Sequence, residues 1–166
     1  MRQRGAFLLL LILTFLNESL KDLAMTVLYV QLYQNRMAVR NLDTRQQVSG
    51  NHVFSNQRII IADFFEAEGF LAHLIQQVAP RSFWHALPGV GRLTILSHAL
   101  EMNEGGLSPV EERALLEMTF GASRGRCRDP KVIADQTPLN DDQVLVALAR
   151  KQDSMTPPGK RPKIIS

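Results

Sequence analysis

The chain has 166 residues, of which 45% are hydrophobic and 21% are charged, and its formal net charge is +3. This composition is typical of a globular protein with one domain and excludes collagen-like and wholly disordered chains. The single cysteine, Cys127, excludes an intramolecular disulfide scaffold and is typical of a reducing compartment.

The positive charge lies largely at the C-terminus. Residues 25–149 carry 11 lysines and arginines against 13 aspartates and glutamates. A nucleic-acid-binding domain should cluster basic residues on a folded face, so we expect no nucleic-acid partner. Residues 152–166 combine prolines with basic residues, including the run 160–163, and predict a disordered basic tail.

The N-terminal segment, residues 1–24, contains an apolar run from Ala6 to Leu16. This run is shorter than the ~20 residues of a membrane-spanning helix. It is interpretable as a signal-peptide core, as an uncleaved anchor at the inner membrane, or as translated sequence upstream of a native start at Met25. We favour the third interpretation, which predicts a cytoplasmic protein. A membrane is then a partner only if residues 1–24 are retained.

The first part of the chain predicts an antiparallel meander. Residues 26–33 alternate along a β-rich segment and predict a strand. A tight turn at 34–35 leads to a second strand over 36–42, and a short third strand is predicted over 45–49. Residues 50–52 are expected to form a loop.

The period of the apolar residues becomes helical over residues 63–78. Asp63 is expected to cap this helix, Glu66 to complete a capping box, and Pro80 to end it. Residues 92–100 then predict a buried strand.

The strongest local signal is Ser108-Pro109-Val110-Glu111, which predicts a capping box and a helix to about Gly121. Residues 131–134 predict a short strand. A last helix is expected to be capped by Asn140 or Asp141 and to be held in the core by Val144, Leu145 and Leu148.

The predicted order is β-β-β-α-β-α-β-α, which favours a mixed sheet in one α/β domain over residues 25–151. This order is that of the ribonuclease-H-like core, which half of the actin fold shares. The predicted fold class is therefore a single ribonuclease-H-like or actin-like half domain.

Three segments resemble the YjaA family of enterobacterial proteins: FSNQR at 54–58, ALEMNEGGLS at 99–108 and VEER at 110–113. The resemblance runs from the first predicted strand to about Lys151. Members of that family are described as stress-response proteins of unassigned biochemistry. The resemblance implies a stress-response role.

A more distant resemblance links IADFF at 61–65 and the following helix to the bacterial actin-like protein MreB. It implies an alternative function, a degenerate actin-like module that binds nucleotide or docks on the bacterial actin cytoskeleton. Actin-type ATPases need an aspartate and a glycine at the first hairpin, for the metal and for close backbone approach to phosphate. This chain has Gln31 and Tyr33 there. The first strand also lacks the carboxylates of a two-metal nuclease.

We therefore predict a non-catalytic protein without cofactor, metal or small-molecule substrate, which acts through protein–protein contact. The candidate partner-contact residues are Trp84, Glu101 and Glu104, although Trp84 is also interpretable as a core residue. The four histidines lack metal-ligand spacing, and His98 is expected to be a hydrogen-bonded structural residue.

Cys127 gives a further alternative, a thiol redox sensor. Three arginines, at positions 124, 126 and 128, flank it in the sequence. Positive charge stabilises a thiolate and makes it more reactive. The alternative interpretation is an ordinary cysteine at the start of a strand.

Overall fold

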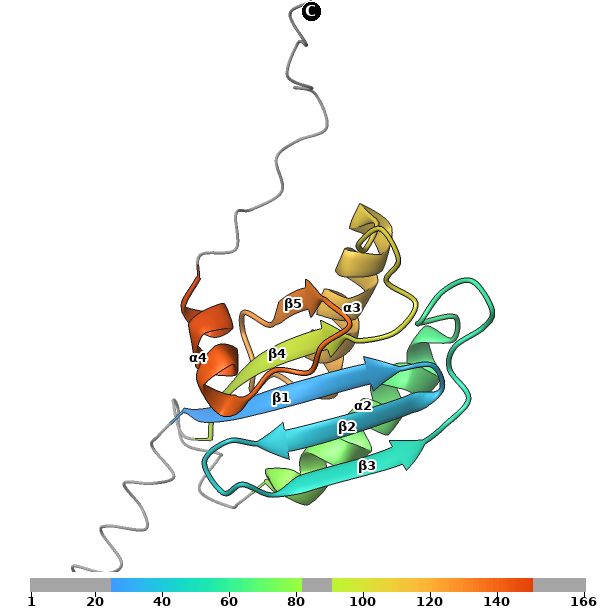
Figure 1. Ribbon diagram of the computed structural model, residues 1–166. Coiled ribbons are helices and arrows are strands. Elements are labelled where there is room, and N and C mark those ends of the chain that lie inside the picture. Colours follow the sequence, from blue (N-terminus) through green and yellow to red (C-terminus); the bar gives the residue numbers. More distant parts are fainter. Residues whose placement is uncertain (1–24, 82–90, 151–166) are drawn as a thin grey trace, which may run out of the picture.

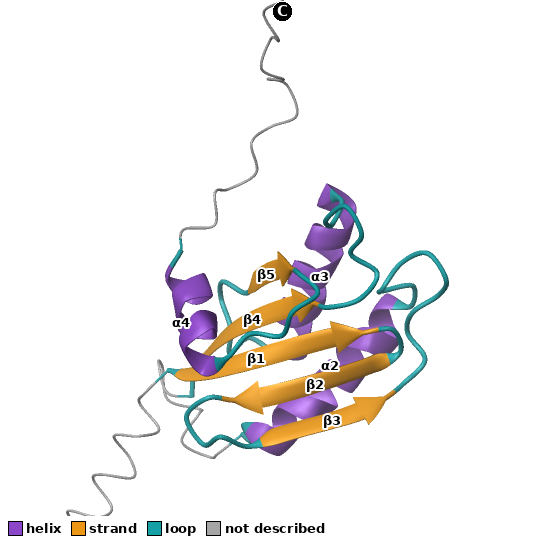
Figure 2. Ribbon diagram, in the orientation of Figure 1, coloured by secondary structure: helices purple, strands orange, loops and turns teal. Residues whose placement is uncertain are grey.

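The computed structural model describes residues 25–81 and 91–150, which form a mixed sheet with helices on both faces (Figure 1, Figure 2). The sheet has five strands in the order β3-β2-β1-β4-β5. β1 pairs antiparallel with β2 and parallel with β4. The elements in chain order are β1 (Thr26–Tyr33), β2 (Arg36–Asn41), β3 (Gln47–Asn51), α2 (Phe64–Val78), β4 (Leu93–Ala99), α3 (Pro109–Ala122), β5 (Lys131–Ala134) and α4 (Asp141–Ala149).

The observed element order, β-β-β-α-β-α-β-α, and the mixed sheet confirm the predicted fold class. The prediction for the third strand needs correction. β3 includes Gly50 and Asn51, which were expected in a loop, because both pair with β2. Such pairing is a contact between strands and leaves no signal in the local sequence. Gly50 also lies against α2, where an added Cβ would come within 2.9 Å of the Phe70 ring.

The main core lies between one face of the sheet and the helices α2 and α3 (Figure 1). β1 is the central strand, and alternate residues of it are buried on opposite faces. Leu28, Val30 and Leu32 face the main core, whereas Tyr29 faces a smaller cluster on the other side.

The second face of the sheet carries α4 alone among the described helices (Figure 2). The buried residues of this smaller cluster are Tyr29, Leu96 and Val144. α4 therefore contributes one fully buried side chain, whereas α2 contributes five.

The capping box expected at α2 is only half formed. Asp63 caps the helix by accepting a hydrogen bond from the Glu66 backbone N–H at 3.2 Å. The Glu66 carboxylate instead contacts His52 Nε2 at 2.6 Å. The tertiary fold brings His52 to this position, so the sequence around Asp63 could not predict the contact.

The capping box at α3 is confirmed. Ser108 Oγ accepts a hydrogen bond from the Glu111 backbone N–H at 3.3 Å. Glu111 Oε2 accepts from the Ser108 backbone N–H at 2.9 Å and from its hydroxyl at 2.7 Å. These hydrogen bonds lower the pKa of Glu111, and the one from the Ser108 hydroxyl has the larger effect.

Replacing Ser108 with alanine is expected to lower the free energy of unfolding by about 1 kcal/mol at neutral pH. Because the folded pKa of Glu111 lies below its unfolded value, its contribution is present above the unfolded pKa and is lost as the pH falls through the folded one. Urea unfolding of both proteins should therefore show a difference that shrinks in acid. Ser49→Ala, at an exposed serine in β3, is the control and should change little at either pH. A pH-independent difference would contradict the role of the carboxylate.

Within residues 25–81 and 91–150, no helix has the length and apolar character needed to cross a membrane. The apolar N-terminal run lies outside the described residues.

Candidate functional site

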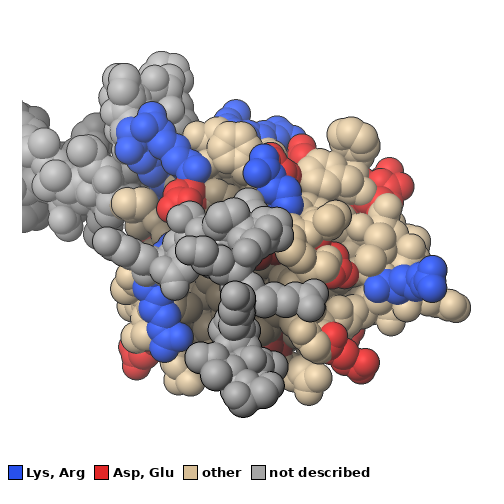
Figure 3. All heavy atoms as spheres, turned by 90° about the horizontal axis from the view of Figure 1, so that it is seen from above, with Lys and Arg blue, Asp and Glu red and all other residues tan. Residues whose placement is uncertain are grey.

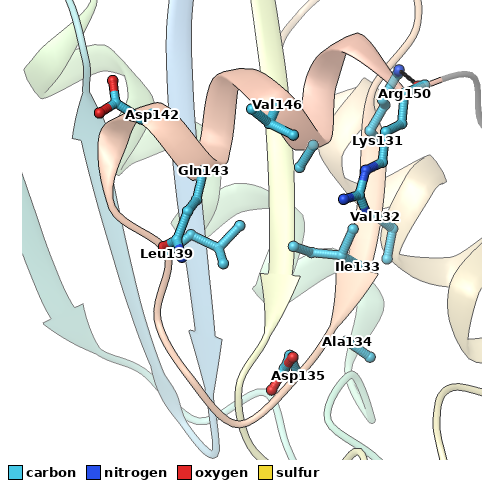
Figure 4. A pocket seen from close by; sticks show the side chains of 11 residues that line it. Lys131, Val132, Ile133, Ala134, Asp135, Leu139, Asp142, Gln143, Val146 and Arg150 are labelled. Atoms are coloured by element: carbon cyan, nitrogen blue, oxygen red, sulfur yellow. Dashed lines mark hydrogen bonds between the residues drawn. The ribbon is translucent and has the colours of Figure 1, made fainter.

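A groove of about 560 Å³ lies between β5 and α4 (Figure 4). We call it the α4–β5 groove. Apolar side chains line most of it, and charged ones lie toward its ends, with Lys131 and Arg150 at one end and Asp135 at the other. Its lining residues are Lys131, Val132, Ile133, Ala134, Asp135, Leu139, Asp142, Gln143, Val146, Ala147 and Arg150.

One wall of the groove is an edge strand. β5 is the last strand of the sheet and pairs with β4 on one side only. The Asp135 N–H donates to the Ala99 carbonyl of β4. Backbone groups alternate in direction along a strand, so those of Val132 and Ala134 point to the outer edge. An unpaired strand edge is a template for pairing with another chain.

The other wall, α4, is held at both ends by polar contacts. At its C-terminal end the Lys131 ammonium donates to the carbonyls of Leu148 and Arg150, where a cation also favours the helix dipole. At its N-terminal end Asn140 forms a capping box with Gln143. The structure thus selects Asn140 from the two caps that the sequence left open.

The residue before that cap, Leu139, is fixed through both of its peptide groups. Its N–H donates to the Tyr29 hydroxyl at 3.0 Å, and its carbonyl accepts from Arg40 Nη2, also at 3.0 Å. Arg40 also forms an ion pair of 2.8 Å with Asp141. β1 and β2 therefore set the position at which α4 begins.

His98 completes this network, and its expected role as a hydrogen-bonded structural histidine is confirmed. Its Nδ1 lies 2.7 Å from the Tyr29 hydroxyl. The same hydroxyl accepts from the Leu139 N–H, so it links the imidazole to the residue before α4. Burial lowers the pKa of His98, an effect that Asp135 partly opposes, and burial raises the pKa of Tyr29. Burial therefore favours the neutral form of both side chains.

The outward side of α4 carries apolar side chains in its second half. Leu145 and Val146 are 50% and 55% exposed, and Ala149 is also exposed, whereas Val144 is fully buried. The prediction that Leu145 lies in the core is therefore wrong, while the prediction for Val144 is confirmed. A helix that is hydrophobic all round is normally buried. This helix covers its sheet on one side and leaves its other apolar side open.

Cys127 is buried, with 1% of its surface exposed, and its N–H donates to Ser123 Oγ at 3.1 Å. Burial raises the pKa of its thiol, although hydrogen bonds from the backbone of Ile95 and Asp129 partly oppose this. Burial therefore opposes the thiolate that the neighbouring arginines were expected to favour, and the redox role of Cys127 stays a prediction.

Cys127 should react slowly with a thiol reagent in the native protein. We expect a rate with dithionitrobenzoate at least ~100-fold below that of the urea-unfolded chain, since the buried thiol reacts only on opening. Cys127 is the one cysteine of the chain, so the absorbance change reports it alone. Equal rates in the two states would show that the native thiol is accessible and would support a redox role.

The two glutamates predicted to contact a partner lie in an exposed loop. Glu101 Oε2 accepts a hydrogen bond of 2.8 Å from the Gln34 backbone N–H and so ties this loop to the first hairpin. Glu104 is exposed just before Gly105 and Gly106, whose φ angles of 82° and 85° turn the chain. Their role in partner contact stays a prediction. Trp84 lies outside the described residues.

The positions expected to depart from the actin pattern lie at the end of β1. Gln31 is 8% exposed, and the Arg36 guanidinium lies over the Tyr33 ring at 3.7 Å. Asn35 takes the left-handed conformation, with φ at 53°, that closes the hairpin. Tyr33 and Arg36 thus form an aromatic–cation stack beside the hairpin turn.

Charged side chains of both signs are interspersed on the face of the molecule that Figure 3 shows. Within the described part of the chain, no group of three or more histidine, cysteine, aspartate or glutamate side chains is arranged to hold a metal ion.

The α4–β5 groove and the open face of α4 are features that the sequence predictions missed. Their signal is present as the apolar run VLVALA at 144–149, which has no polar face. Only the structure shows which side of this run is covered.

No protein-family model matches the chain. The chain is 46% identical over 127 residues to the uncharacterized protein YjaA of Escherichia coli (strain K12). The aligned residues make up 76% of this chain and 100% of the relative. The more distant likeness to actin-like proteins stays a prediction. Because the identity is this high over the whole length of the relative, the chain belongs to the YjaA family.

Proposed function

We propose that the chain is a non-catalytic, cytoplasmic stress-response protein that acts by contact with another protein. The stress-response part rests on the resemblance described above. The contact part rests on one observation, the apolar face that α4 leaves open beside the α4–β5 groove.

Three properties of this surface support binding to protein. Leu145 and Val146 offer apolar area at its centre, and charged residues lie at its ends, as in interfaces with an apolar core and a polar rim. Among the described residues no strand pairs with the outer edge of β5, whose backbone groups lie beside them. The first hairpin supports the non-catalytic part, because Gln31 and Tyr33 replace the groups that metal and phosphate need.

The test is affinity capture of tagged protein from stressed cells, with bound proteins identified by mass. The variant Leu145→Ser/Val146→Ser removes the apolar centre of the surface at two exposed positions. We expect the partner to bind the parent chain and to be lost with this variant. Phe65→Ser, which removes a still more exposed apolar side chain from α2, is the matched control and should retain the partner. Circular dichroism should first show that both variants fold. Equal recovery with all three proteins would overturn the proposal.

A further inference from the structure

The exposed residues of α4 form a stripe with two kinds of chemistry. Asp142, Leu145, Val146, Ala149 and Arg150 are exposed, and their spacing of i, i+3, i+4, i+7 and i+8 places them on one side of the helix. The acid is at the N-terminal end, the base is at the C-terminal end, and the apolar residues lie between them.

This stripe is complementary to itself when a second helix runs antiparallel. A two-fold axis between Leu145 and Val146 brings these side chains of both copies together at the centre. With a rise of about 1.5 Å per residue, Asp142 of one copy and Arg150 of the other then differ by only about 1.5 Å along the axis. The axis generates this pair twice, as a contact between identical surfaces requires.

Both charged side chains are exposed. Neither Asp142 nor Arg150 forms an ion pair through its side chain within the described residues. Asp141, the adjacent acid, already pairs with Arg40. Antiparallel helices also place the positive end of one dipole beside the negative end of the other.

We infer that the open face of α4 binds a second copy of this chain, as a two-fold dimer of antiparallel α4 helices with two Asp142–Arg150 ion pairs. This inference rests on the proposed function and names its partner as the chain itself.

The dimer should be weak. A stable interface buries about 800 Å² per partner, which is more than one helix of nine residues offers. We expect a dissociation constant of roughly 10–100 µM, in the range of small, transient contacts. Monomer should dominate near ~1 µM and dimer near ~500 µM.

Charge exchange between the two positions tests the geometry. Sedimentation equilibrium of the full chain over this concentration range should show a dimer for the parent protein. Asp142→Arg and Arg150→Asp should each weaken dimerisation by at least ~10-fold, since each puts like charges together. The double variant Asp142→Arg/Arg150→Asp should restore the dimer. Both changes oppose the helix dipole, so this rescue could not come from a more stable α4. Gln76→Arg, on the exposed side of α2, is the control for added charge.

Two outcomes would overturn the inference. One is a parent chain that stays monomeric at ~500 µM, and the other is a dimer that neither single variant weakens or that the double variant fails to restore. The proposed function would survive both outcomes if the capture experiment recovered a different protein with the parent chain and did not recover it with the Leu145→Ser/Val146→Ser variant.

Discussion

Replacing Tyr29 with phenylalanine is expected to lower the free energy of unfolding by about 2–4 kcal/mol. The hydroxyl lies in a buried network, where it accepts from the Leu139 N–H and shares a hydrogen bond with His98 Nδ1. Removing it leaves both of these groups without that partner, and an unsatisfied buried group costs about 1–3 kcal/mol. Urea unfolding followed by circular dichroism measures the change.

Tyr33→Phe is the matched control, because Tyr33 lies on the same strand and the same face of the sheet. Its ring contacts Arg36, and its hydroxyl makes no hydrogen bond within the described residues, so the change should stay within about 0.5 kcal/mol. Amide exchange gives a second readout. Exchange at Leu139 should accelerate in Tyr29→Phe more than exchange in α2 does, since this hydroxyl fixes the start of α4. Equal effects of the two substitutions would show that the network contributes nothing specific.

Replacing Leu71 with alanine is expected to cost about 2–5 kcal/mol. Leu71 is fully buried on α2, where it faces the main core. The substitution loses the transfer free energy of the removed carbons and leaves a cavity in a core that relaxes only in part. Thermal and urea unfolding should both report the loss.

Gln76→Ala is the control on the same helix. Gln76 is exposed, and alanine has a helix propensity at least as favourable, so stability should change by less than about 0.5 kcal/mol. If Leu71→Ala were no more destabilising than this control, α2 would not hold the main core as the structure has it.

The elements with strong local signals could be predicted from the sequence. Ser108 and Glu111 lie three residues apart on either side of a proline, and the structure shows the reciprocal hydrogen bonds expected of them. Residues 131–134 form a strand with the predicted bounds. In each case the decisive contacts lie within a few residues, or the pattern reports burial directly.

The candidate site could not be predicted in this way, because its parts are far apart in the sequence. The Tyr29 hydroxyl forms hydrogen bonds with His98, which is 69 positions away in the sequence, and with Leu139, which is 110 positions away. For Cys127, charge adjacent in the sequence predicted a reactive thiol, whereas burial raises its pKa. Burial depends on which elements pack over a residue, and neighbouring residues do not report that.

α4 shows which properties follow from the sequence alone and which depend on the tertiary structure. By itself the sequence determined that a helix begins at a cap formed by Asn140 or Asp141 and that residues 144–149 are apolar, because capping and helix propensity are local. The sequence placed both Val144 and Leu145 in the core, and only the tertiary structure decided that Leu145 faces outward. The orientation of the helix is set by contacts at both of its ends with residues of distant strands, namely Tyr29, Arg40 and Lys131.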